Sequence, residues 1–327
     1  MKVIRNLPTS TPAPHPVLTI GNFDGQHVGH QALLAAVVEM ANRHQGTPMV
    51  LTFDPHPSKI LAPGKPLQFL TPKEEKMEFF EKLGVAELVI LEFSLQLASL
   101  TPEEFTSKVL RDGVGVRELL IGENFVFGKG RSGDVQDLIS LGSQANFRVH
   151  PMAPVEIDGD IVSSTRIRKL LQAGQVKAAT QCLGRPYRLT EHVIQGEKRG
   201  AQLGWPTANL RIAPHRVIPA DGIYATMAYV QGEWLPSVSY IGNRPTFIEG
   251  ERLLEVHLFD QDRSLYGERI QVSFIDFIRG DKQFSDAKNL LDQIEHDASE
   301  ARGILQKLSK DYSQYSEPTS FHSSSYH

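Results

Sequence analysis

Short apolar runs alternate with helical segments through the first half of the chain. The runs are VLTI (17–20), PMVLTF (48–53), AELVIL (86–91), ELLIG (118–122) and FRVHPM (147–152). Helical segments are expected at 31–43, 71–83 and 101–111. Strands that alternate with helices are typical of a parallel sheet covered by helices on its faces. The first half therefore predicts an α/β domain.

Helix signals mark the inside and the end of this domain. TPKE (71–74) and TPEE (101–104) each offer a Thr cap, Pro at the first helical position and Glu three residues after the cap. In SSTRIRKLLQAG (163–174), Ser164 is a candidate cap for a short helix that ends at Gly174. A second short helix is expected to end near Gly184, which places the domain boundary around Arg185.

The pattern changes after this boundary. Short alternating segments separated by Gly and Pro run from Tyr187 to Phe277, among them YRLTEHVI, GIYATMAYV, WLPSVSYIG, LLEVHLFD and RIQVSFIDF. They predict an antiparallel barrel or sandwich. A final helix from Ser285 is expected to pack on it through apolar residues at helical spacing: Leu290, Leu291, Ile294, Ala298, Ala301 and Leu305. We therefore expect domains at 1–185 and 186–310, and a disordered tail at 311–327 that is rich in Ser and Tyr.

Composition and charge bear on the partners and the location of the protein. The 327 residues are 40% hydrophobic and 22% charged, with a net charge of -4. This balance gives no electrostatic reason to expect nucleic acid or an anionic membrane as partner. The single Cys182 excludes an intramolecular disulfide, and neither a signal peptide nor a membrane-spanning run is evident. We predict a cytoplasmic protein; the sequence offers no support for an oligomer.

The stretch GNFDGQHVGH (21–30) follows the first predicted strand. A strand that turns on glycine into a helix points the helix N-terminus, with its unpaired N–H groups, at the space above the sheet edge. That space suits a phosphate. His27 and His30 then share one face of the first turn and can stabilise a phosphoryl group in transfer. Two other interpretations stay open: half of a metal site, and surface histidines without a role.

Further stretches are predicted to reach the same edge of the sheet. LTFDPHP (51–57) presents Asp54 and His56 at the end of a strand, where α/β sheets bind ligands. IGENFVFGKGRSGD (121–134) combines Phe125 and Phe127 with basic residues, which suits an aromatic ring that bears a phosphate, although an ordinary surface loop fits equally well. SSTRIR (163–168) offers hydroxyls, a helix N-terminus and two arginines for a polyphosphate.

The first domain lacks two common catalytic signatures. No GxxxxGK[ST] motif of the P-loop kinases and no GxSxG nucleophile motif occurs. The interpretation that stays is direct transfer between two bound substrates, in which protein groups orient the nucleophile and stabilise the charge of the pentacoordinate phosphorus and the leaving pyrophosphate.

These motifs together resemble a known family. GNFDGQHVGH with SSTRIR is similar to the nucleotidylyltransferases, whose HxGH histidines stabilise the α-phosphate of ATP during transfer. With LTFDPHP, FVFGKGRSGD and SSTRIRKLLQAGQV, the first domain resembles the adenylyltransferase half of the bifunctional bacterial riboflavin kinase/FAD synthetases. The resemblance implies a Rossmann-like nucleotidylyltransferase fold. Asn124 stands where many members have Asp, in a ligand-facing region.

The second domain carries its own motifs. GEKRGAQLGWPTANL (196–210) joins a glycine-rich basic loop, able to close over phosphates, to PTAN. Thr207 and Asn209 both present oxygens that suit Mg²⁺. In LLEVHLFD, alternation leaves Glu255 and His257 on the face opposite Val256 and Leu258. A solvated strand carboxylate is the simple interpretation of Glu255.

These stretches resemble the riboflavin kinase domain, a six-stranded barrel, of the same bifunctional family. The resemblance implies that Thr207 and Asn209 help bind Mg-ATP. It also implies that Glu255 takes the proton from the ribityl 5′-hydroxyl of riboflavin as it attacks the γ-phosphate. GIYA, IGNRPTF, LYGERIQVSFIDFIRGDKQF and QIEHDASEAR support the match, which covers roughly residues 16–303. Trp205 replaces a usual Phe before PTAN.

The site residues that these arguments predict fall into four groups. The catalytic group is His27, His30 and Glu255. The ATP- and phosphate-binding group is Gly21, Asn22, Phe23, Asp24, Gly29, Ser163, Ser164, Thr165, Arg166, Arg168, Gly196, Lys198, Arg199, Gly200 and Gly204. The flavin-binding group is Asp54, His56, Asn124, Phe125 and Phe127, and the metal-binding group is Thr207 and Asn209.

The resemblance implies two successive reactions on one chain. ATP phosphorylates riboflavin to FMN in the barrel, and a second ATP adenylylates FMN to FAD in the α/β domain, with Mg²⁺ serving both. Two alternatives stay open: an adenylyltransferase for another phosphate ester, and a flavin-binding regulator without catalysis. The ring-sized aromatic loop speaks against the first, and an intact set of candidate catalytic residues against the second.

Overall fold

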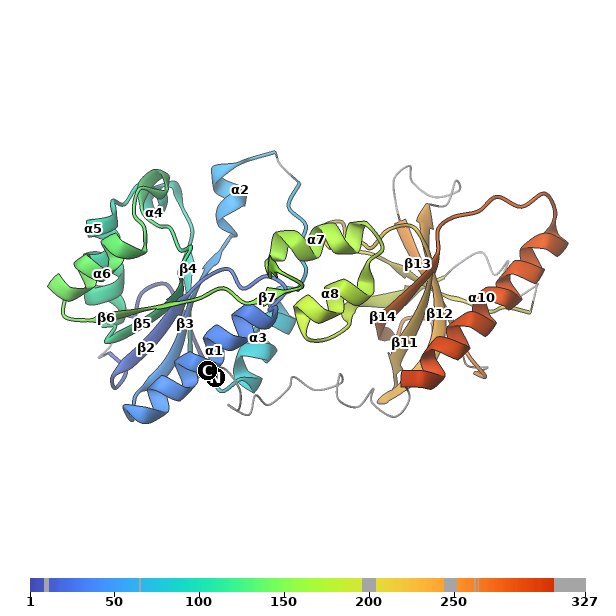
Figure 1. Ribbon diagram of the computed structural model, residues 1–327, viewed down its shortest axis with the longest axis horizontal. Helices are drawn as coiled ribbons and strands as arrows, with labels where there is room; N and C mark the ends of the chain where they lie inside the picture. The colour runs from blue at the N-terminus through green and yellow to red at the C-terminus, as the bar shows by residue number, and fades with distance from the viewer. Residues whose placement is uncertain are drawn as a thin grey trace. The chain divides into compact units, whose positions relative to one another are not determined.

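The computed structural model describes residues 1–8, 12–64, 66–195, 204–243, 252–261, 263 and 265–308. By its internal contacts the chain forms two compact units, unit 1 (Met1–Ser163) and unit 2, which begins at Ser164. The first unit contains a parallel sheet with helices and the second a closed barrel (Figure 1). The α/β and barrel predictions are confirmed, and each unit is described by itself.

The sheet of unit 1 has six parallel strands in the order β1-β4-β3-β2-β5-β6. The bounds are β1 Lys2–Arg5, β2 Pro16–Ile20, β3 Thr47–Asp54, β4 Glu87–Glu92, β5 Glu118–Gly122 and β6 Arg148–Met152. The five predicted runs all form strands. The sequence analysis missed β1, a short edge strand that pairs with β4 over more than eighty residues of chain.

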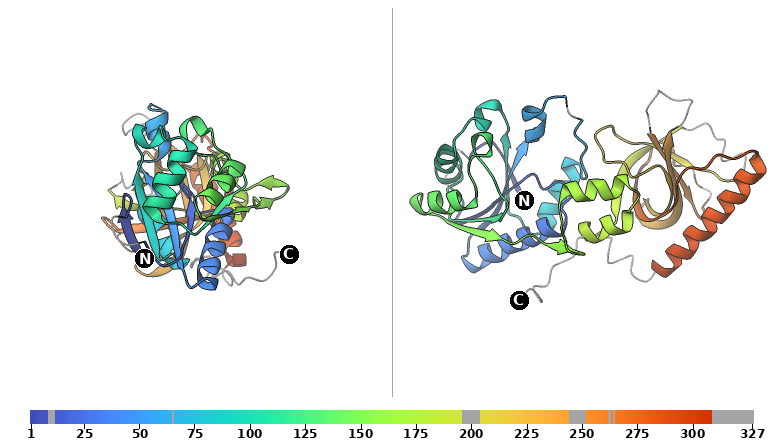
Figure 2. Two further views of the ribbon diagram at one scale, coloured as in Figure 1. Left: turned by 90° about the vertical axis from the view of Figure 1, so that its left-hand side faces the viewer. Right: turned by 45° about the horizontal axis from the view of Figure 1, so that its top comes forward.

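Helices cover both faces of this sheet (Figure 2). Helices α1 (Val28–Arg43) and α3 (Lys73–Lys82) pack on one face, where Leu34 and Phe80 meet strand residues such as Val50. The π-helical stretch η1 (Phe105–Val114) and α6 (Val135–Gln144) pack on the other, where Leu110 and Leu138 lie. Strand residues alternate between the two faces, as the pleat of a strand requires.

The two predicted capping boxes behave differently. At α5 (Pro102–Glu104), which continues into η1, the hydroxyl of Thr101 accepts from the backbone N–H of Glu104, whose carboxylate accepts from the Thr101 N–H. The prediction for Thr71 is wrong, because α3 begins after Pro72 and has no side-chain cap. The buried Asp24 carboxylate instead accepts the N–H of Thr71, at 3.2 Å, and holds that residue outside the helix.

Smaller elements of unit 1 were not predicted. They are helices α2 (Pro57–Leu61) and α4 (Leu95–Ala98), the 3-10 turn η2 (Lys129–Arg131), and the strand pair β7 (Glu156–Ile157) and β8 (Asp160–Ile161). Each is too short to show a hydrophobic period.

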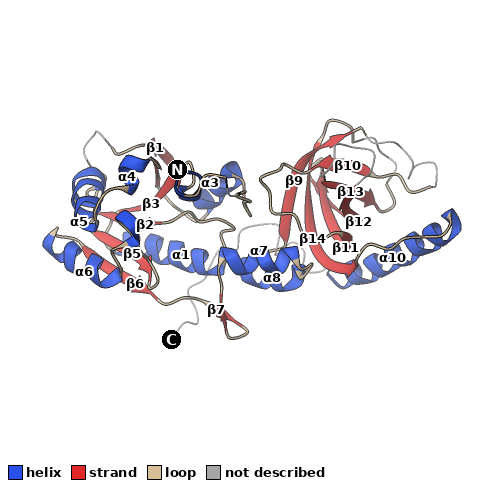
Figure 3. Cartoon of the chain, turned by 90° about the horizontal axis from the view of Figure 1, so that it is seen from above, coloured by secondary structure: helices blue, strands red, loops and turns tan. Residues whose placement is uncertain are grey.

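Unit 2 is a closed antiparallel barrel in the order β10-β13-β12-β11-β14-β9 (Figure 3). The bounds are β9 Tyr187–Ile194, β10 Ala208–Arg211, β11 Gly222–Val230, β12 Glu233–Asn243, β13 Arg252–Leu258 and β14 Arg269–Arg279. Every alternating segment of the sequence forms one of these strands. The sequence analysis did not identify β10, which contains the end of the PTAN motif.

Helices flank the barrel within unit 2. Helix α10 (Ala287–Leu308) packs against it, as predicted, through the buried Ala298, Ala301 and Leu305. The other three predicted residues, Leu290, Leu291 and Ile294, are half-buried. Helices α7 (Ser164–Gln172) and α8 (Val176–Leu183) precede the barrel, and α8 ends at the left-handed Gly184, as predicted. By their contacts both helices belong to unit 2, and the domain boundary near residue 185 stays a prediction.

Candidate active sites

The site of unit 1 lies where the strand order reverses. From β2 the sheet continues through β3 and β4 on one side and through β5 and β6 on the other. In open α/β sheets, ligands bind outside the carboxyl ends of the strands at such a switch point. The carboxyl end of β2 leads through residues 21–27 into α1, and that of β5 into the loop after Gly122.

The turn between β2 and α1 is held in an unusual conformation. Phe23, Gly25 and Gln26 all have positive φ angles, of 50°, 82° and 46°. Positive φ angles cost conformational energy in residues other than glycine, and they persist where surrounding contacts stabilise them. Here the Gln26 amide donates to the Lys76 carbonyl at 3.0 Å, and the Gln31 amide donates to the Gln26 carbonyl at 2.8 Å.

Asp24 supports the same turn. Its side chain is buried, and its carboxylate accepts the backbone N–H of Leu70 at 3.0 and 3.2 Å as well as that of Thr71. A carboxylate in this position ties the turn to the segment that precedes α3. Asp24 therefore supports the loop around the predicted phosphate site, and its own phosphate contact stays a prediction.

His27 and His30 come together as predicted. His27 caps α1, and its Nδ1 accepts the backbone N–H of His30 at 3.3 Å. The two rings stack with centroids 3.6 Å apart. Because Nδ1 of neutral His27 is an acceptor, its proton lies on Nε2, which is thereby a donor. Nδ1 of His30 is buried and has no hydrogen bond among the described residues.

Two glycines make room for this pair. A Cβ on Gly29 would lie 3.3 Å from Cε1 and Nδ1 of His27, and a Cβ on Gly21 would lie 3.1 Å from the Phe23 ring. Phe23 is buried and meets His30 edge-on, with centroids 5.1 Å apart. Gly21, Phe23 and Gly29 therefore shape the histidine pair.

Burial keeps His30 neutral, and nearby basic groups add to this effect. The pKa of His30 lies well below its ordinary 6.5, first because of burial and then because of His27 and Lys76. Lys76, on α3, has its own pKa lowered by burial, while Asp24 and Asp54 act in the opposite direction. An anion that entered beside these groups would raise both pKa values.

Sequence reasoning missed Lys76. Its Nζ donates to the backbone carbonyl of Asn22 at 2.8 Å, inside the predicted phosphate site. Nothing in KEEKMEFF distinguishes this lysine from a solvated one, because only the fold brings α3 beside residues 21–24. Asn22 is placed as predicted, and its buried Oδ1 has no hydrogen bond among the described residues.

Asp54 is the last residue of β3 and His56 follows the strand, as predicted. Asp54 is exposed and forms an ion pair with Lys73 of α3. His56 caps α2 through Nδ1, which accepts the Ser58 N–H at 3.2 Å, and its ring meets Phe69 edge-on at 5.7 Å. Both side chains therefore have local partners, and their flavin contacts stay predictions.

The predicted flavin-binding residues of the loop after β5 differ in how deeply they are buried. Asn124 is exposed and Phe125 is half-buried. Phe127 is only 7% exposed and packs in the core with residues such as Phe105. Little of the Phe127 ring is left for a ligand, so its place is in packing. Phe125, stacked on Phe127 at 5.9 Å, is the more exposed of the two rings, and its flavin contact stays a prediction.

The SSTRIR motif spans the boundary between the units. Ser163 ends unit 1, and α7 begins with Ser164, Thr165 and Arg166, with Arg168 one position beyond Ile167. Ile167 is buried, whereas the two arginines are half-buried. The phosphate contacts of this motif stay predictions.

In unit 2 the structure brings Thr207, Asn209 and Glu255 together. Asn209 on β10 is the register partner of Glu255 on β13. The Thr207 hydroxyl donates to Oε2 of Glu255 at 3.4 Å, and the Asn209 amide donates to the Thr207 carbonyl at 3.3 Å. Oδ1 of Asn209 is buried with no hydrogen bond in the described part of the chain. An unsatisfied amide oxygen beside a hydroxyl suits the oxygen-ligated Mg²⁺.

His257 positions this cluster. Its Nδ1 lies 2.8 Å from the carbonyl of Pro206, and since a carbonyl only accepts, Nδ1 donates. Its ring meets Trp205 at 4.7 Å. Burial lowers the pKa of His257, while the bond to Pro206 acts in the opposite direction. His257 thereby holds the segment that carries Thr207, a role that its sequence pattern did not reveal.

Tyr240 lies on the other side of Glu255. It is the register partner of Glu255 on β12, and a Cβ on Gly242 would lie 2.0 Å from its hydroxyl. Burial, and then the charge of Asp281, raise the pKa of Tyr240 to about 12. Tyr240 therefore stays protonated at neutral pH and is a hydrogen-bond donor near the cluster.

The predicted phosphate loop of unit 2 is described only from Gly204 on. Gly196, Lys198, Arg199 and Gly200 lie outside the described residues. Gly204, which follows them, has a φ of 82°, a conformation that favours glycine.

Comparison with known proteins agrees with both units. A family model described as FAD synthetase matches residues 10–166, and one described as riboflavin kinase matches residues 183–305. The chain is 37% identical to the bifunctional riboflavin kinase/FMN adenylyltransferase of Pseudomonas fluorescens, over 93% of this chain and 98% of that protein. The corresponding protein of Escherichia coli K12 is 36% identical, over 92% and 97%.

The chain belongs to the family of bifunctional riboflavin kinase/FMN adenylyltransferases. The order of the two matches along the chain is the order that the motifs predict. The resemblance inferred from the sequence is thereby confirmed.

The chain also resembles a solved structure along nearly the whole length of both. That structure is described as a macrolide-efflux protein from Streptococcus pneumoniae, is 31% identical, and matches with a TM-score of 0.84 over 92% of this chain and 99% of that one. Among the described residues, none of the helices combines the length and apolar character needed to span a membrane.

Proposed function

We propose that the chain makes FMN from riboflavin in the barrel and FAD from FMN in the α/β unit. In the first reaction the riboflavin 5′-hydroxyl oxygen attacks the γ-phosphorus of ATP and ADP leaves. In the second an FMN phosphate oxygen attacks the α-phosphorus of ATP and pyrophosphate leaves. The observation that carries this proposal is that one chain holds a stacked histidine pair at a switch point and a Thr207–Asn209–Glu255 cluster in a barrel.

In unit 1 the chain supplies positioning and positive charge. Nε2–H of His27 donates to an oxygen of the α-phosphate, at the N-terminus of α1, where the helix dipole favours an anion. His30 and Lys76 lie beside it, so the charge that develops at the pentacoordinate phosphorus meets donors that are already oriented.

The flavin of FMN is held by the loops after β3 and β5. Phe125 offers the accessible aromatic face, and Asn124, Asp54 and His56 offer polar groups at the same sheet edge. A ring-sized aromatic surface favours FMN over a small alcohol phosphate, which would have no use for Phe125.

In unit 2 Glu255 takes the proton of the ribityl 5′-hydroxyl. Thr207 and Asn209 would hold Mg²⁺ with ATP, through a hydroxyl and the unsatisfied amide oxygen. When bound, the cation supplies neutralisation of the phosphate charge. Pairing of β10 with β13 fixes Glu255 beside these two residues, as a base requires.

A time course tests this proposal. We expect purified chain with riboflavin, ATP and Mg²⁺ to produce FMN first and FAD after it, and omission of Mg²⁺ to stop both. Absence of any flavin product would favour a flavin-binding regulator. Formation of FMN without FAD would instead point to another phosphate ester as substrate of unit 1.

Replacement of Lys76 by methionine tests the residue that the sequence did not reveal. We expect FAD formation from FMN to fall about tenfold or more, because a half-buried ammonium beside the phosphate site is lost. Loss of this positive neighbour should also raise the pKa of His30, which NMR titration of the imidazole measures. Lys82→Met, an exposed change on the same helix, is the control. An unchanged pKa of His30 would contradict the assignment.

The lowered pKa of His30 should make stability depend on pH. Its pKa is lowered in the folded chain, so below about pH 6.5 the unfolded chain binds a proton that the folded chain does not. Above about pH 6.5 the neutral His30 leaves the free energy of unfolding at its full value. As the pH falls from there towards the folded pKa, that free energy decreases by up to about 1.4 kcal/mol per pH unit. Because Trp205 and Trp234 both lie in unit 2, circular dichroism rather than tryptophan fluorescence should follow unfolding. His30→Gln should flatten this dependence, whereas His296→Gln, an exposed change in unit 2, should not.

A further inference from the structure

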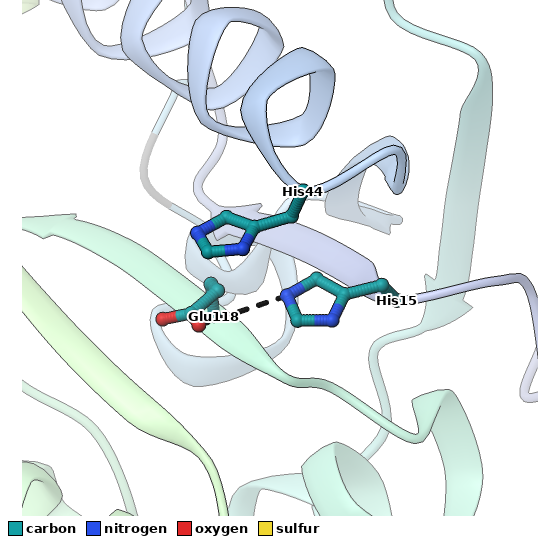
Figure 4. Close-up of side chains that lie close together, drawn as sticks. All are labelled: His15, His44 and Glu118. Atoms are coloured by element: carbon teal, nitrogen blue, oxygen red, sulfur yellow. Dashed lines mark ion pairs between the residues drawn. The ribbon is translucent and has the colours of Figure 1, made fainter.

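A second histidine cluster lies at the opposite edge of the sheet in unit 1. His15 immediately precedes β2, and Glu118 is the first residue of β5. His44 follows the last residue of α1. These residues therefore lie at the amino ends of the strands, whereas His27 and His30 follow the carboxyl end of β2. Figure 4 shows the two rings and the carboxylate pointing into one space.

The potential ligand atoms of this cluster converge. One ligand atom each from His15, His44 and Glu118 lies within 4.8 Å of the other two. Nε2 of His15 is 3.6 Å from Oε1 of Glu118, and the two imidazoles stack with centroids 4.7 Å apart. Nε2 of His15 is buried and has no hydrogen-bond partner among the described residues. A buried nitrogen that faces a carboxylate at this distance without a hydrogen bond can share a ligand with it.

The backbone holds the two histidine loops together. His15 has a positive φ of 37°, and its carbonyl accepts the Thr47 N–H at 3.3 Å. The Thr47 hydroxyl donates to the Pro14 carbonyl at 3.0 Å. A Cβ on Gly46 would lie 2.3 Å from the His15 carbonyl oxygen, so only glycine lets the loops approach this closely. The cluster therefore rests on a backbone arrangement that the sequence specifies.

The surrounding charges favour a cation at this place. The side chain of Glu118 is only 5% exposed, and Nε2 of His150 lies 2.7 Å from its Oε2. That contact leaves Oε1 facing His15, and a histidine that orients a ligating carboxylate is common in metal sites. The carboxyl-terminal end of α1, beside His44, also attracts positive charge. Arg148 lies 3.7 Å from Oε1 but is 77% exposed, so it can swing away.

We infer that His15, His44 and Glu118 bind a divalent transition-metal ion of the zinc class, with His150 orienting the carboxylate. Two imidazoles and a carboxylate suit Zn²⁺, Co²⁺ or Ni²⁺ better than Mg²⁺, which prefers oxygen ligands. Ligand atoms of a tetrahedral zinc site lie about 3.3 Å apart. The pair at 3.6 Å nearly meets this requirement, and the exposed His44 ring can turn to close the remaining separation.

Such an ion would join the end of α1 to the start of β5. It would bind the folded chain and not the unfolded one, so it would stabilise unit 1. This inference does not rest on the proposed reactions, because the cluster lies at the other ends of the strands from the histidine pair.

Equilibrium dialysis against Zn²⁺ in excess Mg²⁺, followed by metal analysis, tests the site. We expect His44→Ala to bind one Zn²⁺ fewer than the unchanged chain, or to bind it at least about tenfold more weakly. Zn²⁺ should also raise Tm of the unchanged chain, by about 3 °C or more at saturation, and this rise should be smaller in His44→Ala. His44 is exposed, so its replacement leaves the core intact.

Two further variants make the result specific. His27, His30 and the terminal His322 and His327 are unchanged in His44→Ala, so the difference between the proteins isolates the cluster. Glu118→Gln should lose the same ion, and His296→Ala, an exposed change in unit 2, should keep it. Equal stoichiometry and affinity in His44→Ala and the unchanged chain would overturn the inference and leave a hydrogen-bonded histidine–glutamate network without a metal.

Discussion

Replacement of Glu255 by glutamine is expected to lower the rate of riboflavin phosphorylation by about 10² to 10⁴, the usual loss when a general base is removed. Glutamine keeps the shape of the side chain, and its amide oxygen can still accept from the Thr207 hydroxyl, so the cluster should persist. ATP binding and the conversion of supplied FMN to FAD should stay near normal. Separate initial rates with riboflavin and with FMN measure the two activities.

The control for this variant is Glu233→Gln, an exposed carboxylate at the start of β12. It should leave both rates unchanged, because its ion-pair partner, Arg263, is not one of the candidate site residues. Undiminished phosphorylation in Glu255→Gln would mean that Glu255 is an ordinary strand carboxylate and that another acceptor, such as water, takes the proton.

Replacement of His30 by alanine is expected to lower FAD formation and to leave riboflavin phosphorylation intact. FAD formation from supplied FMN should fall roughly a hundredfold or more, the scale for loss of one transition-state donor. The variant also removes the ring that stacks on His27 and packs against Phe23, so the remaining histidine loses its support. Riboflavin phosphorylation should survive, because the Thr207–Asn209–Glu255 cluster lies in unit 2.

Circular dichroism and the kinase rate of His30→Ala serve as controls for folding. A fall in both activities together with a loss of structure would mean that the substitution unfolds the chain. A fall in both activities with structure retained would contradict the assignment of the two reactions to separate units.

Local sequence patterns predicted most of the strands and the long helices, because each carries its own hydrophobic period. The missing pieces depend on contacts between distant segments. β1 is a strand only because it pairs with β4, and Thr71 fails to cap α3 because Asp24, far away in the sequence, accepts its N–H. The helix and strand propensities of a short stretch of sequence carry no information about either contact.

The candidate sites divide in the same way. The His27–His30 pair and the approach of Thr207 to Glu255 followed from motifs, because helical spacing or family resemblance places these residues. Lys76 was missed because its neighbours read as a solvated helix face. The burial of Phe127 was missed because a loop aromatic looks the same whether it faces the core or a ligand.

The His15–His44–Glu118 cluster illustrates a third case. No spacing in the sequence connects these residues, which lie at one helix end and at the starts of two strands that pair in parallel. Only the strand order, with β2 beside β5, brings them together.

The central claim is that one chain performs two chemically different transfers from ATP, and isotopic labelling tests it most directly. The chain is incubated with riboflavin, Mg²⁺ and ATP labelled with ³²P in either the γ- or the α-phosphate, and the flavins are separated. We predict that γ-label enters FMN and persists in FAD, and that α-label enters FAD alone, with the remaining label in pyrophosphate or ADP. Label from the α-phosphate in FMN, or its absence from FAD, would contradict the account.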